Sequence, residues 1–166
     1  AADIATSADG ATSVFVADMD NDGDLDIISA SYLDDVIAWY ENDGAADPSW
    51  TAADIATSAD GAYSVFVEDL DGDGDLDIIS ASESDNTIAW YENDGAADPS
   101  WAAADITTGG ANAPYASSVF VADLDNDGDK DIVSANYNND AIAWYENDGA
   151  ADPSFNISNI STSADG

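Results

Sequence analysis

The stretch VFVADMDNDGDLDIISAS, residues Val14 to Ser31, decides the fold of this chain because it joins two apolar runs through one acidic loop. Both runs have the β-branched and aromatic composition typical of strands. Gly23 holds the sixth position of the loop, and five aspartates alternate around it: Asp18, Asp20, Asp22, Asp24 and Asp26. The same construction returns as VFVEDLDGDGDLDIISAS at Val65 to Ser82 and as VFVADLDNDGDKDIVSAN at Val119 to Asn136. The chain is therefore built from one unit that occurs three times.

The composition of the 166 residues is extremely acidic. Thirty-six acidic residues against one basic residue give a formal charge of −35, which should repel the folded chain unless cations or high salt offset it. Nucleic acid and anionic membrane surfaces are poor partners, since Lys130 is the sole cationic side chain. Hydrophobic residues nevertheless make up 45% of the chain, which favours a packed core over disorder. The absence of cysteine excludes disulfides, and the absence of histidine argues against zinc, copper and histidine-based catalysis.

No apolar run approaches the roughly 20 residues that a membrane-spanning helix requires, so no membrane span is predicted. The sequence opens on AADIATSADG, without a basic or apolar leader. We therefore expect a mature or trimmed product.

Each unit contains four short segments with strand character, separated by turn residues. In the first unit they are Val14–Ala17, Asp26–Ser31, Val36–Glu41 and a weaker Ala53–Thr57. The three extra residues of the second unit fall in a loop-like connector, Gly109 to Pro114. No segment shows a sustained helical period, so helix should be close to absent.

The central strands are nearly continuous apolar runs, which is typical of small sheets covered on both faces. Four antiparallel strands in about 50 residues with both faces buried describe a blade of a β-propeller. We therefore predict an all-β fold of three four-stranded blades plus one extra N-terminal strand. The predicted boundaries within the single repeat region 1–166 are 1–12 for the extra outer strand, 13–63 for blade 1, 64–117 for blade 2 and 118–166 for blade 3.

Three blades are fewer than the four to eight with which propellers close. The chain is then either a slice of a longer array or a unit that associates with other copies, for example two chains making six blades. A strand exchanged between neighbours is a further route, since open sheet edges invite pairing.

The acidic loops have the chemistry of calcium sites. Calcium takes six to eight oxygen ligands in flexible geometry, and carboxylates at alternate loop positions can converge on one ion. We predict that four side chains and one carbonyl serve each loop, with the carbonyls from Asp24, Asp75 and Asp129. The predicted side-chain ligands are Asp18, Asp20, Asp22 and Asp26, then Asp69, Asp71, Asp73 and Asp77, then Asp123, Asp125, Asp127 and Asp131. Magnesium is the competing ion, but it demands strict octahedral geometry and retains its waters.

An EF-hand begins with a similar loop and is excluded by two observations. Its loop ends in a bidentate glutamate at position 12, where this chain has Ser29, Ser80 or Ser134. Its loop also lies between helices, whereas these loops lead directly into Ile-Ile or Ile-Val strands.

The D-x-D-x-D-G-x-x-D loop between two strands, in units that end in AWYENDG, closely resembles the FG-GAP/VCBS repeats of integrin-α-like β-propellers. The resemblance covers essentially the whole chain in three copies. It implies one calcium ion per blade, three per chain, on the loop between the first and second strands. It also implies a secreted or cell-surface protein used in adhesion, recognition or matrix building. Integrin-like rings have seven blades, so three blades put any central-axis binding site in doubt.

Repeated aromatic residues have two interpretations. The pairs Trp39-Tyr40, Trp90-Tyr91 and Trp144-Tyr145 occupy the third strand of each unit and suit packing between blades, although they would also stack on sugars. Trp50, Trp101 and Phe155 follow the Asp-Pro turns and are expected to cap blade edges. Asn156 and Asn159 begin two N-glycosylation sequons, which matter only in a eukaryotic secreted protein.

Together these features predict a calcium-binding segment of an extracellular adhesion or structural protein, in which the ion rigidifies each blade. Its expected partners are proteins or glycans at the cell surface or matrix, and neighbouring repeats or further copies of itself. A carbohydrate-binding lectin and an accessory repeat beside a secreted enzyme are the alternatives. Catalysis by the chain itself is not expected, because the candidate carboxylates are triplicated and already suited to a cation.

Overall fold

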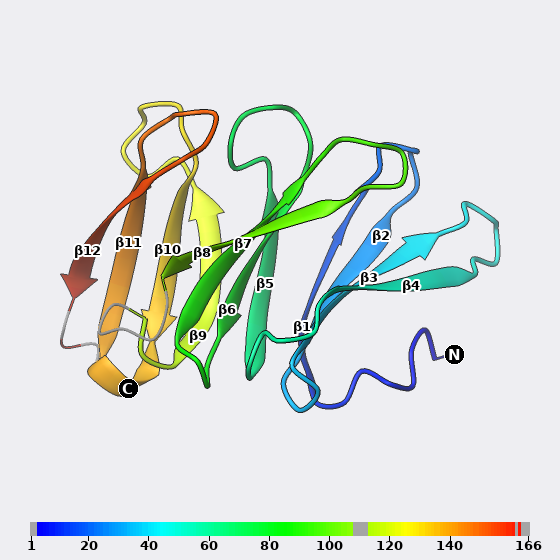
Figure 1. Ribbon diagram of the computed structural model, residues 1–166, viewed down its shortest axis with the longest axis horizontal. Helices are drawn as coiled ribbons and strands as arrows, with labels where there is room; N and C mark the ends of the chain where they lie inside the picture. The colour runs from blue at the N-terminus through cyan, green and yellow to red at the C-terminus, as the bar shows by residue number, and fades with distance from the viewer. Residues whose placement is uncertain (1–2, 108–112, 162, 164–166) are drawn as a thin grey trace.

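The computed structural model describes residues 3–107, 113–161 and 163, and within them the chain forms three antiparallel four-stranded sheets that stand in a row (Figure 1). Sheet 1 contains β1 (Ala11–Ala17), β2 (Asp26–Ser31), β3 (Val36–Asn42) and β4 (Trp50–Ala56). Sheet 2 contains β5 (Ala62–Glu68), β6 (Asp77–Ser82), β7 (Thr87–Asn93) and β8 (Trp101–Thr107). Sheet 3 contains β9 (Ala116–Ala122), β10 (Asp131–Asn136), β11 (Ala141–Asn147) and β12 (Phe155–Ser161), with a 3-10 turn, Tyr137–Asn139, before β11.

The predicted all-β architecture is confirmed. Strands follow one another in order within every sheet, and each pairs with its sequence neighbour. The second strand of sheet 1 has the predicted bounds, whereas its fourth strand begins at Trp50, three residues before the predicted Ala53. Sheets 1 and 3 lie at opposite ends of the row (Figure 1), and the described residues form no closed propeller.

The extra N-terminal strand that the sequence predicts at 1–12 is not found among the residues of this range that the structure describes. Residues 3–10 contain no strand, and β1 itself begins at Ala11. Part of the matching segment, Asp54 to Ala56 at the end of β4, is a strand because it pairs with β3. Residues 3–10 have no such third strand beside them among the described residues, and their backbone therefore follows bends and a turn.

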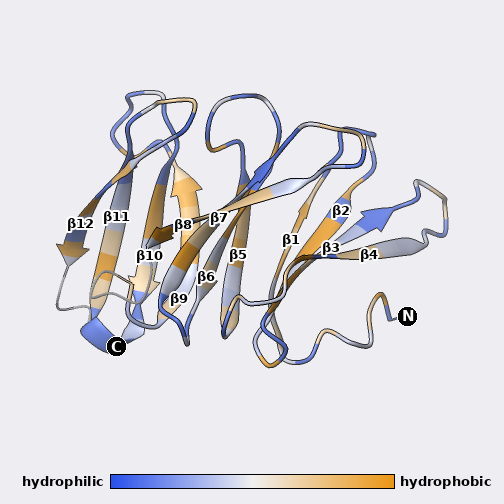
Figure 2. Ribbon diagram, viewed as in Figure 1, coloured by the Kyte–Doolittle hydropathy of each residue, from blue (hydrophilic) through white to orange (hydrophobic). Residues whose placement is uncertain are grey.

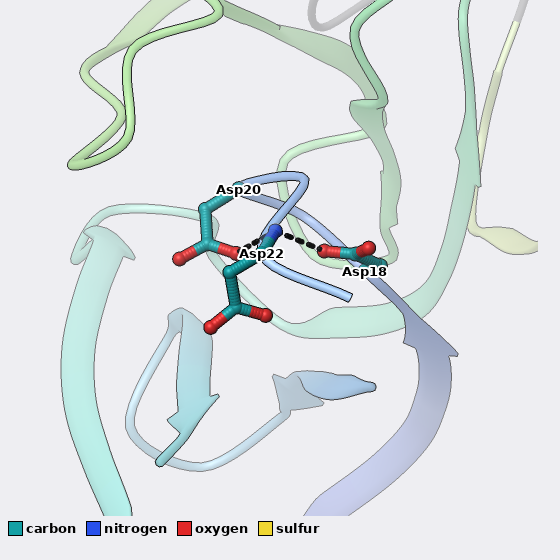
Figure 3. A group of neighbouring side chains, drawn as sticks. All are labelled: Asp18, Asp20 and Asp22. Carbon is teal, nitrogen blue, oxygen red and sulfur yellow. Dashed lines mark hydrogen bonds between the residues drawn. The ribbon is translucent and has the colours of Figure 1, made fainter. Parts of the chain in front are cut away.

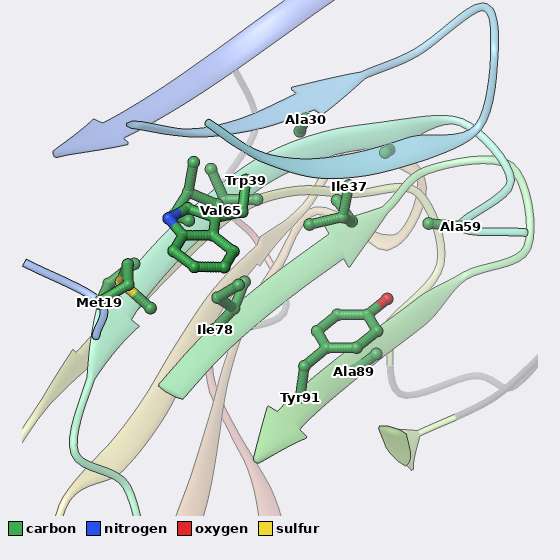
Figure 4. Packing of buried hydrophobic residues seen from close by; sticks show 12 residues of the cluster. Met19, Ala30, Ile37, Trp39, Ala59, Val65, Ile78, Ala89 and Tyr91 are labelled. Carbon is green, nitrogen blue, oxygen red and sulfur yellow. The ribbon is translucent and has the colours of Figure 1, made fainter. Parts of the chain in front are cut away.

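Hydrophobic side chains fill the two junctions between the sheets. In the first junction, Met19 and Trp39 of the first repeat pack with Val65 and Tyr91 of sheet 2 (Figure 4). Ile28 belongs to the same cluster. The second junction repeats this arrangement one unit further along the chain, with the residues Leu70, Ile79, Trp90, Val119 and Tyr145. Both faces of the middle sheet are covered, which explains why β6 is buried along its whole length.

The first strands of the three sheets lie next to one another along the row. β1 contacts β5, and β5 contacts β9. A ladder of phenylalanines joins them, since the ring centroids of Phe15 and Phe66 lie 5.0 Å apart and those of Phe66 and Phe120 lie 4.6 Å apart. Hydropathy colouring shows apolar stretches in strands such as β2 and β11 (Figure 2).

Buried tryptophans confirm the packing interpretation of the aromatic pairs. Trp39 is 4% exposed and lies 6.4 Å from Trp101, measured between ring centroids, so sheets 1 and 2 meet through these two rings. Phe155 packs in the corresponding way against the cluster that contains Trp90. Trp101 and Phe155 thus pack against the blade junctions, a position that the predicted role of capping blade edges did not specify.

In the part of the chain that the structure describes, no helix has the length and apolar character needed to cross a membrane. The predicted connector loop at 109–114 falls mostly outside the described residues.

Candidate metal sites

Each acidic loop joins the first and second strands of its sheet, and all three loops lie along the same edge of the row, at the top of Figure 1. The first and third loops contain two residues with left-handed backbone, Asn21 and Gly23 in the first and Asn126 and Gly128 in the third. An added Cβ at Gly23 would meet no atom within 4 Å, so the positive φ of 98° is what requires glycine there.

The loop backbone turns its N–H groups toward its own carboxylates. In the first loop the N–H of Asp22 donates to Asp18 at 3.1 Å and to Asp20 at 3.2 Å (Figure 3). The N–H of Gly23 also donates to Asp18, at 3.0 Å. The N–H of Asp24 donates to Asp22 at 2.8 Å. These bonds hold the carboxylates at alternate loop positions in place.

Carboxylate oxygens converge in every loop. In each of three groups of aspartates, one oxygen per residue lies within 4.8 Å of the others. Two oxygens bound to one calcium ion at about 2.3–2.6 Å can be no more than about 5.2 Å apart, so this spacing fits calcium. The groups are Asp18, Asp20 and Asp22; Asp69, Asp71 and Asp77; and Asp123, Asp125 and Asp127.

The third loop supplies a further indication that a cation belongs there. Oδ1 of Asp123 is buried and has no hydrogen-bond partner. A buried carboxylate oxygen without a partner is costly unless a cation satisfies it. The donor set of this loop therefore fits a calcium ion in chemistry as well as in spacing.

The aspartate at the ninth loop position also has a structural role that the sequence pattern did not reveal. Asp26 accepts hydrogen bonds from the N–H of Met19 at 3.1 Å and from the N–H of Asn42 at 2.9 Å. Asp77 and Asp131 accept the equivalent pairs at the same distances. This carboxylate thus ties the start of the loop to the end of the third strand, and only in the second loop does it also join the converging group.

Electrostatics in the loops also favour a cation. Burial raises the pKa of Asp77 to about 7, despite the N–H groups of Asn93 and Leu70 that favour its charged form. Desolvation, together with the neighbouring charges of Asp73 and Asp69, raises the pKa of Asp71 as well. A divalent ion would reverse both effects by stabilising the carboxylates.

The fourth aspartate of each loop turns away from the converging group. The side chain of Asp24 lies against Gly44, where an added Cβ would come within 2.2 Å of its Oδ2. Asp75 meets Gly95 and Asp129 meets Gly149 in the same way. Only the backbone carbonyl of this residue was predicted to bind metal, and that carbonyl assignment stays a prediction.

The asparagines after the second and third Trp-Tyr-Glu sequences, Asn93 and Asn147, connect neighbouring repeats. They were missed because the Asn-Asp-Gly sequence indicated only a turn. The side-chain amide of Asn93 donates to the carbonyl of Met19, in the first loop, at 3.0 Å and to the carbonyl of Leu76, in its own loop, at 3.1 Å. Asn147 links the third loop to the carbonyl of Leu70 in the second loop, at 3.1 Å. The sequence signal that could have revealed this role is the occurrence of an asparagine at the same place in all three units.

The predicted glycosylation sites lie on the outermost strand of sheet 3. Asn156 and Asn159 are both exposed on β12, and the amide of Asn156 donates to Glu146 at 3.1 Å. Whether a glycan is attached stays a prediction.

Three sheets of four antiparallel strands, each with an acidic loop between its first two strands, define a propeller-type repeat protein. The model of the FG-GAP-like repeat family matches residues 18–80 and 69–134, and the chain belongs to this family. The predicted resemblance is thereby confirmed. No curated protein matches the chain.

Proposed function

We propose that this chain is a calcium-binding repeat segment of an extracellular adhesion or structural protein, with one calcium ion in each acidic loop. The observation that carries the proposal is the convergence of carboxylates in three equivalent loops, each already ordered by its own N–H groups. Two carboxylates 4 Å apart repel by about 4 kcal/mol at an effective dielectric of 20, so a bound cation relieves a real cost.

In this proposal the calcium ion has a structural, stabilising role. The first two loops lie next to a junction, because their second residues enter the hydrophobic core between sheets: Met19 is 1% exposed and Leu70 is 2% exposed. Fixing the loop therefore also fixes a side chain that holds two blades together. At a free calcium concentration a hundredfold above Kd, each site would add about 2.7 kcal/mol of stability.

An extracellular setting follows from the same chemistry. Calcium sites of extracellular modules work at about 10⁻⁴–10⁻³ M free ion, a concentration that exists outside cells. The abundance of negative surface charge is also less harmful where divalent cations are plentiful. Partners at the cell surface or matrix belong to this proposal, and no catalytic step does.

Titration calorimetry tests the proposal. Calcium should bind with a stoichiometry of about three per chain, and magnesium should bind more weakly. Replacing Asp20 by Asn should remove one site, while Asp9→Asn, which alters an exposed aspartate outside the loops, should remove none. Binding of fewer than one calcium ion per chain would overturn the proposal, as would an Asp20→Asn variant that still binds three.

A further inference from the structure

The two junctions inside the chain use opposite faces of successive sheets. We call the face that meets the preceding sheet the entry face and the face that meets the following sheet the exit face. Sheet 1 presents its exit face to the entry face of sheet 2, and sheet 2 presents its exit face to the entry face of sheet 3. The entry face of sheet 1 and the exit face of sheet 3 are left without a partner in the part of the chain described.

On the uncovered entry face of sheet 1, residues are exposed whose counterparts in sheet 2 are buried. Val14 and Val16 are 65% and 52% exposed, whereas the matching Val65 and Val67 of sheet 2 are each 4% exposed. Ile4, Ala8, Val14, Val16, Ile27 and Tyr40 line an apolar groove on this face. In the first internal junction the residues that match Ile4 and Ala8 are Ile55 and Ala59, which come from the preceding unit. Residues 3–10 therefore already cover part of this face, and a docking partner would have to displace them.

The uncovered exit face of sheet 3 shows the complementary pattern. Leu124 is 44% exposed, although Leu70 at the same loop position is 2% exposed. Phe120, which ends the phenylalanine ladder, is 54% exposed. Trp144 is half-buried, whereas Trp90 at the same place in sheet 2 is buried.

We propose that a second copy of this chain docks head to tail, with the exit face of sheet 3 of one copy against the entry face of sheet 1 of the other. The occupant is inferred from the chain itself, because it makes this same junction twice and each uncovered face has the residues of one half of it. The proposal does not depend on calcium in the loops.

Polar groups at the two faces match as well as apolar ones do. In both internal junctions an asparagine of the following sheet donates to the carbonyl at the second position of the preceding loop. In the proposed contact, Asn42 of the copy that offers its entry face takes the same place and would donate to the carbonyl of Leu124 in the other copy. The hydroxyl of Ser13 accepts from the N–H of Val65 at 3.3 Å, and that of Ser64 accepts from the N–H of Val119 at 3.3 Å. Ser118 is therefore placed to accept from Val14 of the second copy.

The single basic residue does not obstruct this contact. Lys130 pairs with Glu68 at 3.7 Å across the second internal junction. At the proposed junction the corresponding residues are Leu25 and Ala122, both apolar, which repeats the Leu76 and Ala17 combination of the first internal junction. No unpaired charge would therefore be buried at this point.

Two copies docked at both faces would have six blades, which lies within the four to eight of closed propellers. A heterologous contact of this kind closes into a ring when the rotation permits. Repulsion between copies with a charge of −35 opposes the contact, so salt should strengthen association.

Sedimentation velocity and native mass spectrometry of the whole chain in excess calcium test the proposal, from micromolar concentration to about 1 mM. The unaltered chain should form species of two or more copies. Val16→Asp, on the entry face, and Leu124→Asp, on the exit face, should each stay monomeric, while an equimolar mixture of the two should associate. Ala102→Asp, on an exposed position of the outer strand β8, adds the same charge and should leave association unchanged.

A chain that remains monomeric throughout this concentration range would overturn the proposal. So would a Leu124→Asp variant that associates like the unaltered chain, since that would indicate pairing of identical faces. A mixture of the two variants that fails to associate would also contradict it, provided circular dichroism shows both variants folded. The same mass spectra count bound calcium, so failure of docking is distinguishable from failure of metal binding.

Discussion

Truncation of Leu70 to alanine tests whether the second residue of the loop holds the blades together. Leu70 is 2% exposed in the junction between sheets 2 and 3. Removing a buried leucine side chain costs about 2–5 kcal/mol, through lost burial and the cavity left behind. Leu124 offers a matched control, because it has the same loop position in the third repeat but is 44% exposed.

The expected cost of Leu124→Ala is about 1 kcal/mol or less, since much of this side chain already contacts water. Both variants should be compared by urea unfolding of the calcium-loaded protein, at a dilution where the chain is monomeric. The two substitutions share the same chemistry and local propensity, so their difference reports the junction. Equal losses of unfolding free energy, within about 0.5 kcal/mol, would refute the packing argument.

Three further predictions concern hydrogen bonds and backbone shape. Asn93→Ala should lower the free energy of unfolding by about 1–3 kcal/mol more than Asn42→Ala does in chemical denaturation. The reason is that Asn93 alone of this pair binds a carbonyl of a preceding repeat. Equal losses would contradict this. Gly128→Ala should cost about 1 kcal/mol and weaken one calcium site in calorimetry, since φ is 106° there; unchanged stability and affinity would count against it. The Ser154 hydroxyl and nearby N–H groups lower the pKa of Asp148, so Ser154→Ala should raise that pKa in an NMR titration, and an unmoved pKa would contradict the assignment.

The sign of the Asp148 effect on stability follows from the direction of its pKa shift. A carboxyl whose pKa is lower in the folded protein stabilises the fold above its unfolded pKa. That contribution is lost as the pH falls through the folded pKa. Any loss of stability in Ser154→Ala should therefore be present at neutral pH and diminish in acid.

The repeat pattern predicted most of the fold. Three copies of one unit, with turn residues between strand-like segments, were enough to predict three four-stranded sheets and to locate the loop between Ala17 and Asp26. The N-terminal strand was mispredicted because strand formation depends on a neighbouring strand, and residues 3–10 have none among the described residues. Local composition alone does not contain that information.

The candidate sites were only partly predictable. Alternating aspartates predicted that carboxylates converge in each loop, because residue spacing in a tight loop largely fixes where they point. Each group holds three of the four predicted side chains, and the complete ligand sets stay a prediction. The hydrogen bonds that Asp26 accepts from the N–H of Asn42 and that Asn93 donates to the carbonyl of Met19 join residues 16 and 74 positions apart in sequence. Such contacts arise from strand pairing and sheet stacking, so no local motif reveals them.

Native mass spectrometry with and without calcium tests the central claim most directly. With calcium, each chain should carry three ions in excess of nonspecific adducts, and Asp20→Asn should carry two. Chelation should then lower the melting temperature by well over about 10 °C, given roughly 8 kcal/mol from three sites and about 2–4 °C per kcal/mol at this size. A chain that carries no specific calcium, and whose melting temperature is unchanged by exhaustive chelation, would contradict the account.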